Sequence, residues 1–325
     1  MAKIHQPRHG SMQYWPRVKS KRAYAKVRAW SNTSKDPILG FMGYKVGMTQ
    51  VMAIDTGKTS ISKGEEIVVP VTVVECPPLK IAGVRLYRHA YLGKQAATEI
   101  LFKVDKDLSR KLTVQKVHKE HGELDKLDIK NYTDVKLLVY TQPRFAGVGK
   151  KKPEIFEVAM SGSIADKIKF VKDHHDKELL FNNFFKDGEF VDVHAVTKGK
   201  GLQGPVKRFG VTFKNHKTEK GVRRVGTLGG WSGQGHFLYR VAHPGQMGYH
   251  LRTEFNKHLI KIGTKAEEVN PIGGWPHYGL VKSTYVLIRG SVAGPQNRAI
   301  IMTKPLRQRP VTAVPTITEI NVQPK

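Results

Sequence analysis

Three closely spaced glycines are the first feature of this chain that suggests chemistry. Gly199, Gly201 and Gly204 match the G-x-G-x-x-G pattern of dinucleotide-binding loops and of the glycine-rich loop of protein kinases. A dinucleotide site needs a helix that opens at the third glycine, but the stretch 205–211 has only seven residues and contains Gly210. The HRD and DFG motifs of kinases are absent. We therefore predict that these glycines bring the backbone close to phosphate without forming a nucleotide site.

Catalytic and metal-binding patterns are scarce. The Gly-Trp-Ser-Gly-Gln stretch that ends at Gln234 misses the nucleophile elbow because glutamine replaces the final glycine. Histidines at 174 and 175, and at 243, 250 and 258, have neither a pair of thiolates nor an HExxH motif beside them. The sequence thus predicts no enzyme, no metal site, no cofactor and no small-molecule substrate.

Positive charge is the strongest chemical signal. The segment from Val193 to Lys265 holds 14 Lys and Arg residues against two acidic residues, Glu219 and Glu254, and it contains 13 glycines. The whole chain has 55 Lys+Arg, 27 Asp+Glu and a formal net charge of +28. Such charges repel one another unless a polyanion lies between them, and glycine costs backbone entropy unless a close approach offsets it. The predicted partner is a nucleic acid.

Other partners and compartments are less compatible with the sequence. We find no apolar run of about 18 residues, and the basic N-terminus has no apolar segment typical of a signal peptide, so no membrane is expected. Cys76 is the single cysteine, which excludes an internal disulfide framework and agrees with a reducing, cytoplasmic location. We expect Cys76 to be a small buried apolar residue.

The elements that must position the charges are mainly strands. The first 35 residues hold nine Lys and Arg, no acid and four scattered aromatic residues, which favours an extended arm that orders on its partner over a solvated tail. Folding is expected to begin at Pro37. A helix is predicted over 162–180, capped by Ser163. The predicted strands are 38–54, 66–75, 83–92, 135–141, 154–160, 190–197, 279–289 and 298–303.

This order of elements predicts a barrel assembled from both ends of the chain, with the basic segment looped out. The predicted regions are a basic N-terminal extension (1–36), the first part of the barrel (37–92), an α+β insertion (93–182), a barrel strand (183–197), a basic glycine-rich central extension (198–265), and the last part of the barrel with a C-terminal tail (266–325).

Short motifs along nearly the whole chain resemble one known family. Gly43-Tyr-Lys-Val-Gly-Met-Thr-Gln50 closely resembles the opening strand of the universal large-subunit ribosomal protein three family. The Pro-Arg-His-Gly tail and the long insertion are typical of its archaeal and eukaryotic branch, and the size fits an archaeal member. Further matches follow in chain order at Pro7–Ser11, at Thr197–Gly204 with Lys207 and Arg208 after it, at Gly229–Trp231, at Pro244–Arg252 and at Gly290–Pro295.

The resemblance implies a mainly β fold, namely a six-stranded translation-factor-type barrel with an inserted α+β subdomain and long basic extensions. It implies a structural constituent of the large ribosomal subunit that binds large-subunit ribosomal RNA and supports early assembly. The central extension would support the conformation of the peptidyl transferase region. Members of the ribosomal protein fourteen and twenty-four-e families are the expected neighbours. An RNA-modifying enzyme and a free RNA chaperone, each with basic arms, remain alternatives.

The expected RNA contacts follow from side-chain chemistry. Arginine binds two phosphate oxygens at once, and lysine acts as a point charge. The alternative for each of these basic residues is that it lies on a solvated surface and binds no phosphate. Trp231 is flanked by glycines and is predicted to stack on a base or wedge into an RNA fold. Gln246, Tyr249 and His250 are predicted to hydrogen-bond to ribose or phosphate. The alternative is that they belong to a tight turn at Pro244-Gly245, which would also be compatible with binding. The predicted RNA-binding residues are Arg8, His9, Arg17, Arg22, Lys45, Lys198, Lys200, Lys207, Arg208, Lys214, Arg223, Arg224, Trp231, Arg240, His243, Gln246, Tyr249, His250 and Arg252.

One position departs from the family pattern. Eukaryotic members carry a methylated histidine twelve residues before the tip tryptophan, and that position here is Glu219. The modification is therefore not expected in this chain. A carboxylate at this position is predicted to face Lys217, Lys220 or Arg223, or else a cation, because facing phosphate would be repulsive.

Overall fold

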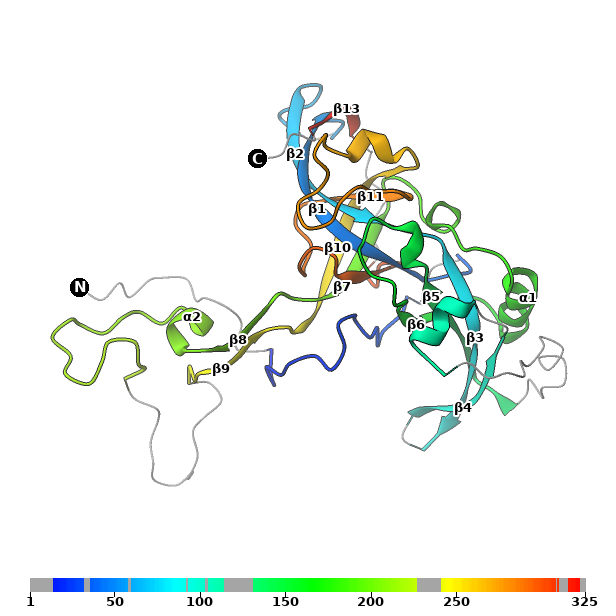
Figure 1. The fold of residues 1–325 in the computed structure, drawn as a ribbon, viewed down its shortest axis with the longest axis horizontal. Helices are drawn as coiled ribbons and strands as arrows, with labels where there is room; N and C mark the ends of the chain where they lie inside the picture. Colours follow the sequence, from blue (N-terminus) through cyan, green and yellow to red (C-terminus); the bar gives the residue numbers. More distant parts are fainter. Residues whose placement is uncertain are drawn as a thin grey trace. The chain divides into compact units, whose positions relative to one another are not determined.

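The protein divides into two compact units. A computed structural model describes residues 14–31, 36–57, 60–91, 93–102, 105–113, 131–226, 241–307, 309 and 315–321. We call residues Met1–Arg22 with Val196–Leu251 the hairpin unit, and residues Ala23–Ala195 with Arg252–Lys325 the body. Strands dominate the described residues, and Figure 1 shows their arrangement within each unit.

The larger sheet has seven strands in the order β12-β7-β10-β11-β2-β1-β13, and β12 also pairs with β1. Six strands therefore form a closed ring of pairings, and β13 pairs with the far end of β1 outside that ring. The strands are β1 (Gly40–Ile54), β2 (Glu66–Glu75), β7 (Phe190–Val196), β10 (Leu251–Gly263), β11 (Tyr285–Arg289), β12 (Ala299–Thr303) and β13 (Thr316–Asn321).

Strand β1 explains the glycines of the opening motif. Its first eight residues are all buried, so both faces of this half-strand are covered. A Cβ at Gly43 would lie 2.7 Å from Val74 Cγ1 and 2.8 Å from the Glu75 carbonyl oxygen. A Cβ at Gly47 would lie 2.6 Å from the Trp275 ring. These glycines are required by close packing, since any side chain would push the neighbouring groups away.

The second sheet has four strands in the order β4-β3-β5-β6, with a helix beside it (Figure 1). Its strands are β3 (Leu79–Ala90), β4 (Gly93–Leu101), β5 (Asp134–Thr141) and β6 (Ile155–Ala159), and the helix is α1 (Ile164–His174). Short 3-10 turns occupy Lys106–Arg110, Pro143–Phe145, Phe181–Asn183 and Ala266–Val269.

The predicted helix is confirmed at its start but is shorter than predicted. The Ser163 hydroxyl accepts a hydrogen bond from the Asp166 backbone N–H, and the Asp166 carboxylate accepts one from the Ser163 N–H, which makes a capping box. The helix ends at His174. Leu179 instead exchanges backbone hydrogen bonds with Leu79, so the apolar positions after His174 serve a β-bridge.

A buried carboxylate links the two sheets of the body. Glu75, at the end of β2, is fully buried and accepts hydrogen bonds from the backbone N–H groups of Gly147, Lys282 and Ser283 at 2.7 to 2.9 Å. The hydroxyl groups of Ser283 and Tyr278 also donate to it. Burial, with the adjacent carboxylate, raises the pKa of Tyr278 far above its ordinary value. The carboxylate therefore joins residues from three separate parts of the chain.

Part of the predicted N-terminal arm belongs to the body. Tyr24 and Ala25 are buried there, and the ring of Trp30 lies so close to Gly40 that a Cβ at Gly40 would be 2.8 Å from it. Folding therefore begins before Pro37, the expected start. The scattered aromatic residues gave no periodicity from which this packing could have been predicted.

The hairpin unit contains two short strands and one short helix. Strand β8 (Gly199–Gln203) pairs antiparallel with β9 (Gly245–Gly248), and α2 (Pro205–Phe209) begins directly after β8. The predicted central extension, 198–265, is too long at its C-terminal end. Strand β10 starts at Leu251 and pairs with β11 in the large sheet, where Leu259 and Ile260 are buried.

Candidate nucleic-acid interface

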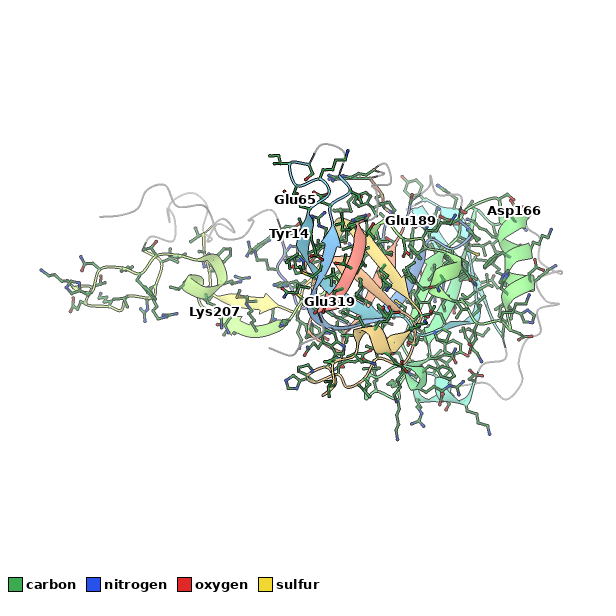
Figure 2. The ribbon with its side chains drawn as sticks, turned by 90° about the horizontal axis from the view of Figure 1, so that it is seen from above. Tyr14, Glu65, Asp166, Glu189, Lys207 and Glu319 are labelled. Carbon is green, nitrogen blue, oxygen red and sulfur yellow. The ribbon has the colours of Figure 1, made fainter. Side chains whose placement is uncertain are left out.

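The described residues of the hairpin unit concentrate positive charge without an apolar core. They include 13 Lys and Arg against one carboxylate, Glu219. Among these described residues, only Val196 and Phe209 are buried. Figure 2 shows Lys207 on α2, and its side chain is exposed. Cations at this density, with so few carboxylates among them, attract a polyanion.

The two strands of the hairpin approach each other at a glycine. Gly248 has a φ of +73°, and a Cβ there would lie 2.0 Å from the Lys198 carbonyl oxygen. That same oxygen accepts a hydrogen bond from the Tyr249 N–H at 3.1 Å. Tyr249 itself has a φ of +54°, a strained conformation for a residue with a side chain. The backbone at Lys198 is therefore held in place by a turn more than 40 residues away.

The glycine pattern at 199–204 has structural explanations. Gly199 lies against the Tyr249 side chain, Gly201 has a φ of +67°, and Gly204 is the N-cap of α2. A helix opens after the third glycine, within the short stretch 205–211 that is insufficient for a dinucleotide site. It has only five residues and ends where Gly210 adopts the left-handed conformation, so it is far shorter than the helix of a dinucleotide fold.

Arg208 has structural partners that the sequence did not reveal. Its Nε donates to the Gln246 carbonyl oxygen at 3.2 Å, and its Nη1 donates to the His243 carbonyl oxygen at 2.8 Å. Burial lowers the pKa of the Arg208 guanidinium. The guanidinium therefore joins α2 to the backbone at His243 and in β9, and its contact with phosphate stays a prediction.

The N-terminal segment joins this surface. The Ser20 N–H donates to the Tyr249 carbonyl oxygen at 2.8 Å, and His250 Nδ1 lies 2.9 Å from the Val18 carbonyl oxygen. The Arg17 guanidinium lies 4.2 Å from the centroid of the Phe209 ring. The structure thus brings the N-terminal segment, which contains the predicted Arg17, against residues between 192 and 232 positions away. Lys19, whose ammonium lies 5.7 Å from the Tyr249 ring, belongs to the same surface and was missed because its charge alone did not single it out.

The residues directly after Pro244 lie in strand β9, Gly245–Gly248, and not in the tight turn at Pro244-Gly245 considered as an alternative. Gln246 Nε2 donates to the carbonyl oxygens of Met247 at 3.3 Å and Gly248 at 3.0 Å. The His250 N–H donates to the Thr197 hydroxyl at 3.1 Å. Contacts of Gln246, Tyr249 and His250 with ribose or phosphate stay a prediction.

A second cluster of cations lies in the loop 213–224, which we call the tip loop. The Lys214 N–H donates to the Val222 carbonyl oxygen at 3.0 Å and closes the loop. The Arg223 guanidinium lies 5.0 Å from the centroid of the Phe213 ring. Arg223, Arg224 and Glu219 are exposed, while Lys214 is half-buried.

The remaining predicted contacts divide into three groups. Lys45 lies in the body and is only 8% exposed, and its ammonium donates to the carbonyl oxygens of Val292 and Gly294. Its ammonium thus has partners within the body, and a contact of Lys45 with RNA stays a prediction. Arg252 is half-buried in β10, and Lys198, Lys200, Lys207 and Arg22 are exposed in the hairpin unit. The residues that lie outside the described part of the chain are Arg8, His9, Trp231 and Arg240.

The described residues form neither a metal-binding cluster nor a membrane-spanning helix. No three His, Cys, Asp or Glu side chains there gather in a way that would hold a metal ion. No helix in this part is long and apolar enough to cross a membrane. Cys76 is buried as expected, and burial raises the pKa of its thiol.

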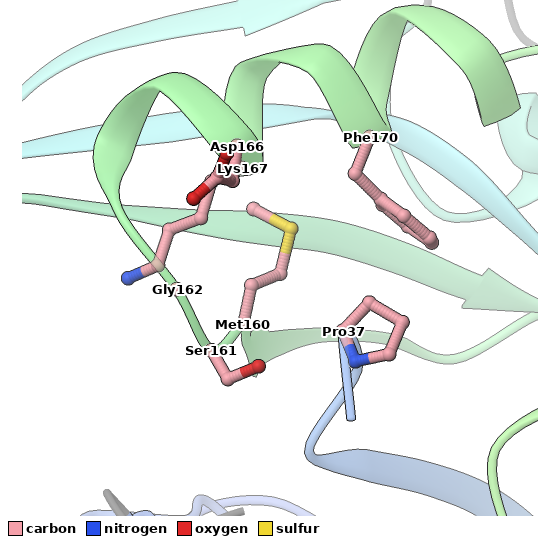
Figure 3. A pocket seen from close by; sticks show the side chains of 7 residues that line it. All are labelled: Pro37, Met160, Ser161, Gly162, Asp166, Lys167 and Phe170. Carbon is pink, nitrogen blue, oxygen red and sulfur yellow. The ribbon is translucent and has the colours of Figure 1, made fainter. Parts of the chain in front are cut away.

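One cavity of about 260 Å³ lies at the start of α1 (Figure 3). Its charged lining residues already have partners. Asp166 caps the helix through Ser163, and the Lys167 ammonium lies 2.7 Å from an Asp134 carboxylate oxygen. With Met160 and Phe170 as its apolar walls, the cavity presents no reactive group.

Comparison with known proteins identifies the family. The model of the family described as Ribosomal protein L3 matches residues 1–313. The chain is 42% identical over 309 residues to the large ribosomal subunit protein uL3 of Archaeoglobus fulgidus, covering 94% of this chain and 93% of that protein. It is 42% identical to the uL3 protein of Methanococcoides burtonii, covering 99% of each chain, and 40% identical to that of Methanosphaera stadtmanae, covering 100% of this chain and 99% of the other.

The chain belongs to the ribosomal protein L3 family. The family match spans segments of both the body and the hairpin unit, so the basic extension is part of the L3 pattern. L3 is a structural protein rather than an enzyme, and the resemblance drawn from the short motifs is confirmed.

Proposed function

We propose that this L3 protein is a structural constituent of the large ribosomal subunit and that its hairpin unit is the main surface for large-subunit ribosomal RNA. The observation that carries this proposal is the combination of 13 cations, one carboxylate and two buried residues in the described part of the hairpin unit. A segment with so little apolar burial gains its order from a partner that neutralises the charge. The protein acts in the cytoplasm, within the subunit.

The finer architecture is part of the same proposal. We infer that the ring of six paired strands is a barrel of the translation-factor type, and that the four-stranded sheet with α1 is the inserted α+β subdomain. The basic extensions are residues 1–22 and 196–251, which places the C-terminal boundary near Leu251. Packing of Tyr24 and β10 in the body supports these shorter limits.

The place in the subunit follows from family membership. The protein joins the subunit early in assembly and supports the conformation of the peptidyl transferase region through the extension that carries Trp231. Proteins of the ribosomal protein fourteen and twenty-four-e families are its proposed neighbours. The exposed phosphate ligands are Lys198, Lys200, Lys207, Arg223 and Arg224, joined by Lys19 and Arg22 from the N-terminal segment.

Salt dependence of RNA binding tests the proposal. The variant in which Lys198, Lys200, Lys207 and Arg224 are replaced by glutamine should bind large-subunit RNA with a log–log salt slope about 3 units shallower than the wild type, because each phosphate contact contributes about 0.7 to 0.9. The measurement is an equilibrium titration of the full chain at several salt concentrations.

The matched control replaces four cations of the body that already pair with carboxylates. Lys80, Lys94, Lys167 and Lys261 lie 2.7 to 3.0 Å from Asp105, Asp134, Asp134 and Glu268. Their replacement by glutamine should leave the slope near that of the wild type. Equal slopes for all three proteins would contradict the proposal. Release from the large subunit by high salt would instead favour a free RNA chaperone.

A further inference from the structure

The tip loop contains an exposed aromatic residue that phosphate binding does not explain. Phe213 is 54% exposed, although the Arg223 guanidinium lies 5.0 Å from the centroid of its ring. An exposed cation–π pair contributes only about 0.5–1 kcal/mol, which is a small gain for keeping a phenylalanine in water. The position gave no signal in the sequence because a single phenylalanine among lysines fits any loop.

The backbone of the loop fixes the pair. The Lys214 N–H bond to the Val222 carbonyl oxygen at 3.0 Å brings the residues that precede and follow it side by side, so Phe213 and Arg223 meet at the closed end. Within the turn, Asn215 Oδ1 accepts from the Lys217 N–H at 3.1 Å, and the Asn215 carbonyl oxygen accepts from the Thr218 N–H at 3.0 Å. The ring is therefore held by local structure, and one cation orients it.

A second phenylalanine in the same unit, Phe209, has the burial and neighbours expected of an aromatic side chain that packs within the protein. Phe209 is only 9% exposed, and two guanidinium groups, those of Arg17 and Arg208, lie 4.2 Å and 5.1 Å from its centroid. That ring has its neighbours within the protein. Phe213 has one guanidinium beside it and more than half of its surface open, so it retains a planar apolar surface for a partner.

We propose that Phe213, oriented by Arg223, is a stacking platform for an unpaired base of RNA. Five cations of the tip loop attract the phosphates on either side of that base, and the open surface of the ring accepts the base itself. These cations are Lys214, Lys217, Lys220, Arg223 and Arg224. This inference rests on the proposed RNA-binding function and adds that the tip loop recognises a base as well as the backbone.

The test compares two RNA probes of equal charge with the full-length protein. One is a single-stranded oligouridylate about 12 nucleotides long, and the other is an abasic ribose-phosphate chain of the same length. Phe213→Ala should weaken binding of the oligouridylate by about 5- to 150-fold, the range for loss of one base–aromatic stack, and leave binding of the abasic chain unchanged. Phe213→Trp should restore oligouridylate binding.

Two further variants serve as controls. Leu202→Ala removes another exposed apolar side chain of the same unit, 77% exposed, and should not alter the preference for the base-bearing probe. Arg224→Gln should weaken both probes equally, because it removes a phosphate contact.

Three results would overturn the platform. These are an unchanged oligouridylate affinity in Phe213→Ala, an equal loss for both probes in that variant, and no preference of the wild type for the base-bearing probe. If the wild type bound neither probe at low salt, the proposed RNA-binding function itself would be overturned. This outcome can be distinguished from failure of the platform, because only here does the wild type fail to bind the abasic chain.

Discussion

The body and the hairpin unit are stabilised in different ways. In the body, many charged groups have protein partners, and the buried Lys304 lies 2.8 Å from both Asp36 and Glu189. In the hairpin unit, a single carboxylate faces 13 cations among the described residues. Guanidinium groups there lie over phenylalanine rings or donate to backbone carbonyl oxygens. The body thus pairs many of its charges internally, whereas the described hairpin unit has only one carboxylate with which to pair its cations.

This difference shows how one chain combines a stable fold with a nucleic-acid surface. Burial of apolar side chains and pairing of charges stabilise the body without a partner. Close backbone approaches at glycine and a few hydrogen bonds give the hairpin unit a defined path, while its charge keeps it open to RNA. The next three predictions test this contrast, and they complement the salt and stacking experiments above.

The largest expected difference between the two units is in how much the loss of one carboxylate lowers the free energy of unfolding. Glu75→Ala removes the acceptor of three backbone N–H groups and two hydroxyl groups in the core, so the free energy of unfolding should fall by at least about 3 kcal/mol. Glu219→Ala, at an exposed position, should change it by less than about 0.5 kcal/mol. Urea denaturation followed by circular dichroism measures both. Similar losses of unfolding free energy in the two variants would contradict the proposed difference between the body and the hairpin unit.

Two glycines of the hairpin unit allow the cost of a steric clash to be distinguished from the cost of a left-handed backbone conformation. Gly248 and Gly201 both have positive φ, but a Cβ at Gly248 would lie 2.0 Å from the Lys198 carbonyl oxygen, and a Cβ at Gly201 would meet no atom within 4 Å. Gly201→Ala should cost about 1–2 kcal/mol from the left-handed conformation alone. Gly248→Ala should cost about 1–3 kcal/mol more, because the strands must separate.

Hydrogen exchange at the Tyr249 amide reports this cost, since that N–H donates to the Lys198 carbonyl oxygen. Protection should fall clearly in Gly248→Ala and only slightly in Gly201→Ala. Equal protection in the two variants would show that the close approach of β8 and β9 does not hold the hairpin together.

A pH effect of smaller size is expected from the body. His194 lies between the hydroxyl groups of Thr253, at 3.0 Å, and Thr303, at 3.1 Å, and burial lowers its pKa below the ordinary value of 6.5. The unfolded chain then binds more protons than the folded chain as pH falls below about 6.5, so this histidine makes the protein less stable in acid.

His194→Gln should make the free energy of unfolding less dependent on pH between about 7 and 5. Urea titrations of the wild type and the variant across that range give the two slopes. Identical slopes would mean that the buried imidazole does not contribute to the acid sensitivity of the body.

Several elements could be predicted from the sequence because their patterns are local. Strand β2 has the predicted limits, Glu66–Glu75, and its valine-rich run is typical of a buried strand. The capping box at Ser163 lies within four residues of sequence. By contrast, β10 was predicted as extension, because Lys257 and Lys261 resemble free charges in the sequence. The structure pairs them with Glu254 at 2.9 Å and Glu268 at 2.7 Å.

The sequence by itself determined the family, the mainly β fold and the polyanionic partner, since motifs, alternation and net charge are properties of residue order and composition. Only the tertiary structure decided which groups surround each cation. Lys45 and Arg208 donate to carbonyl oxygens inside the protein, whereas Arg17, Lys19 and the tip loop belong to the hairpin unit. The physical reason is that a lysine or arginine has the same charge anywhere in the sequence, and its role depends on whether carbonyl oxygens, carboxylates or water surround it after folding.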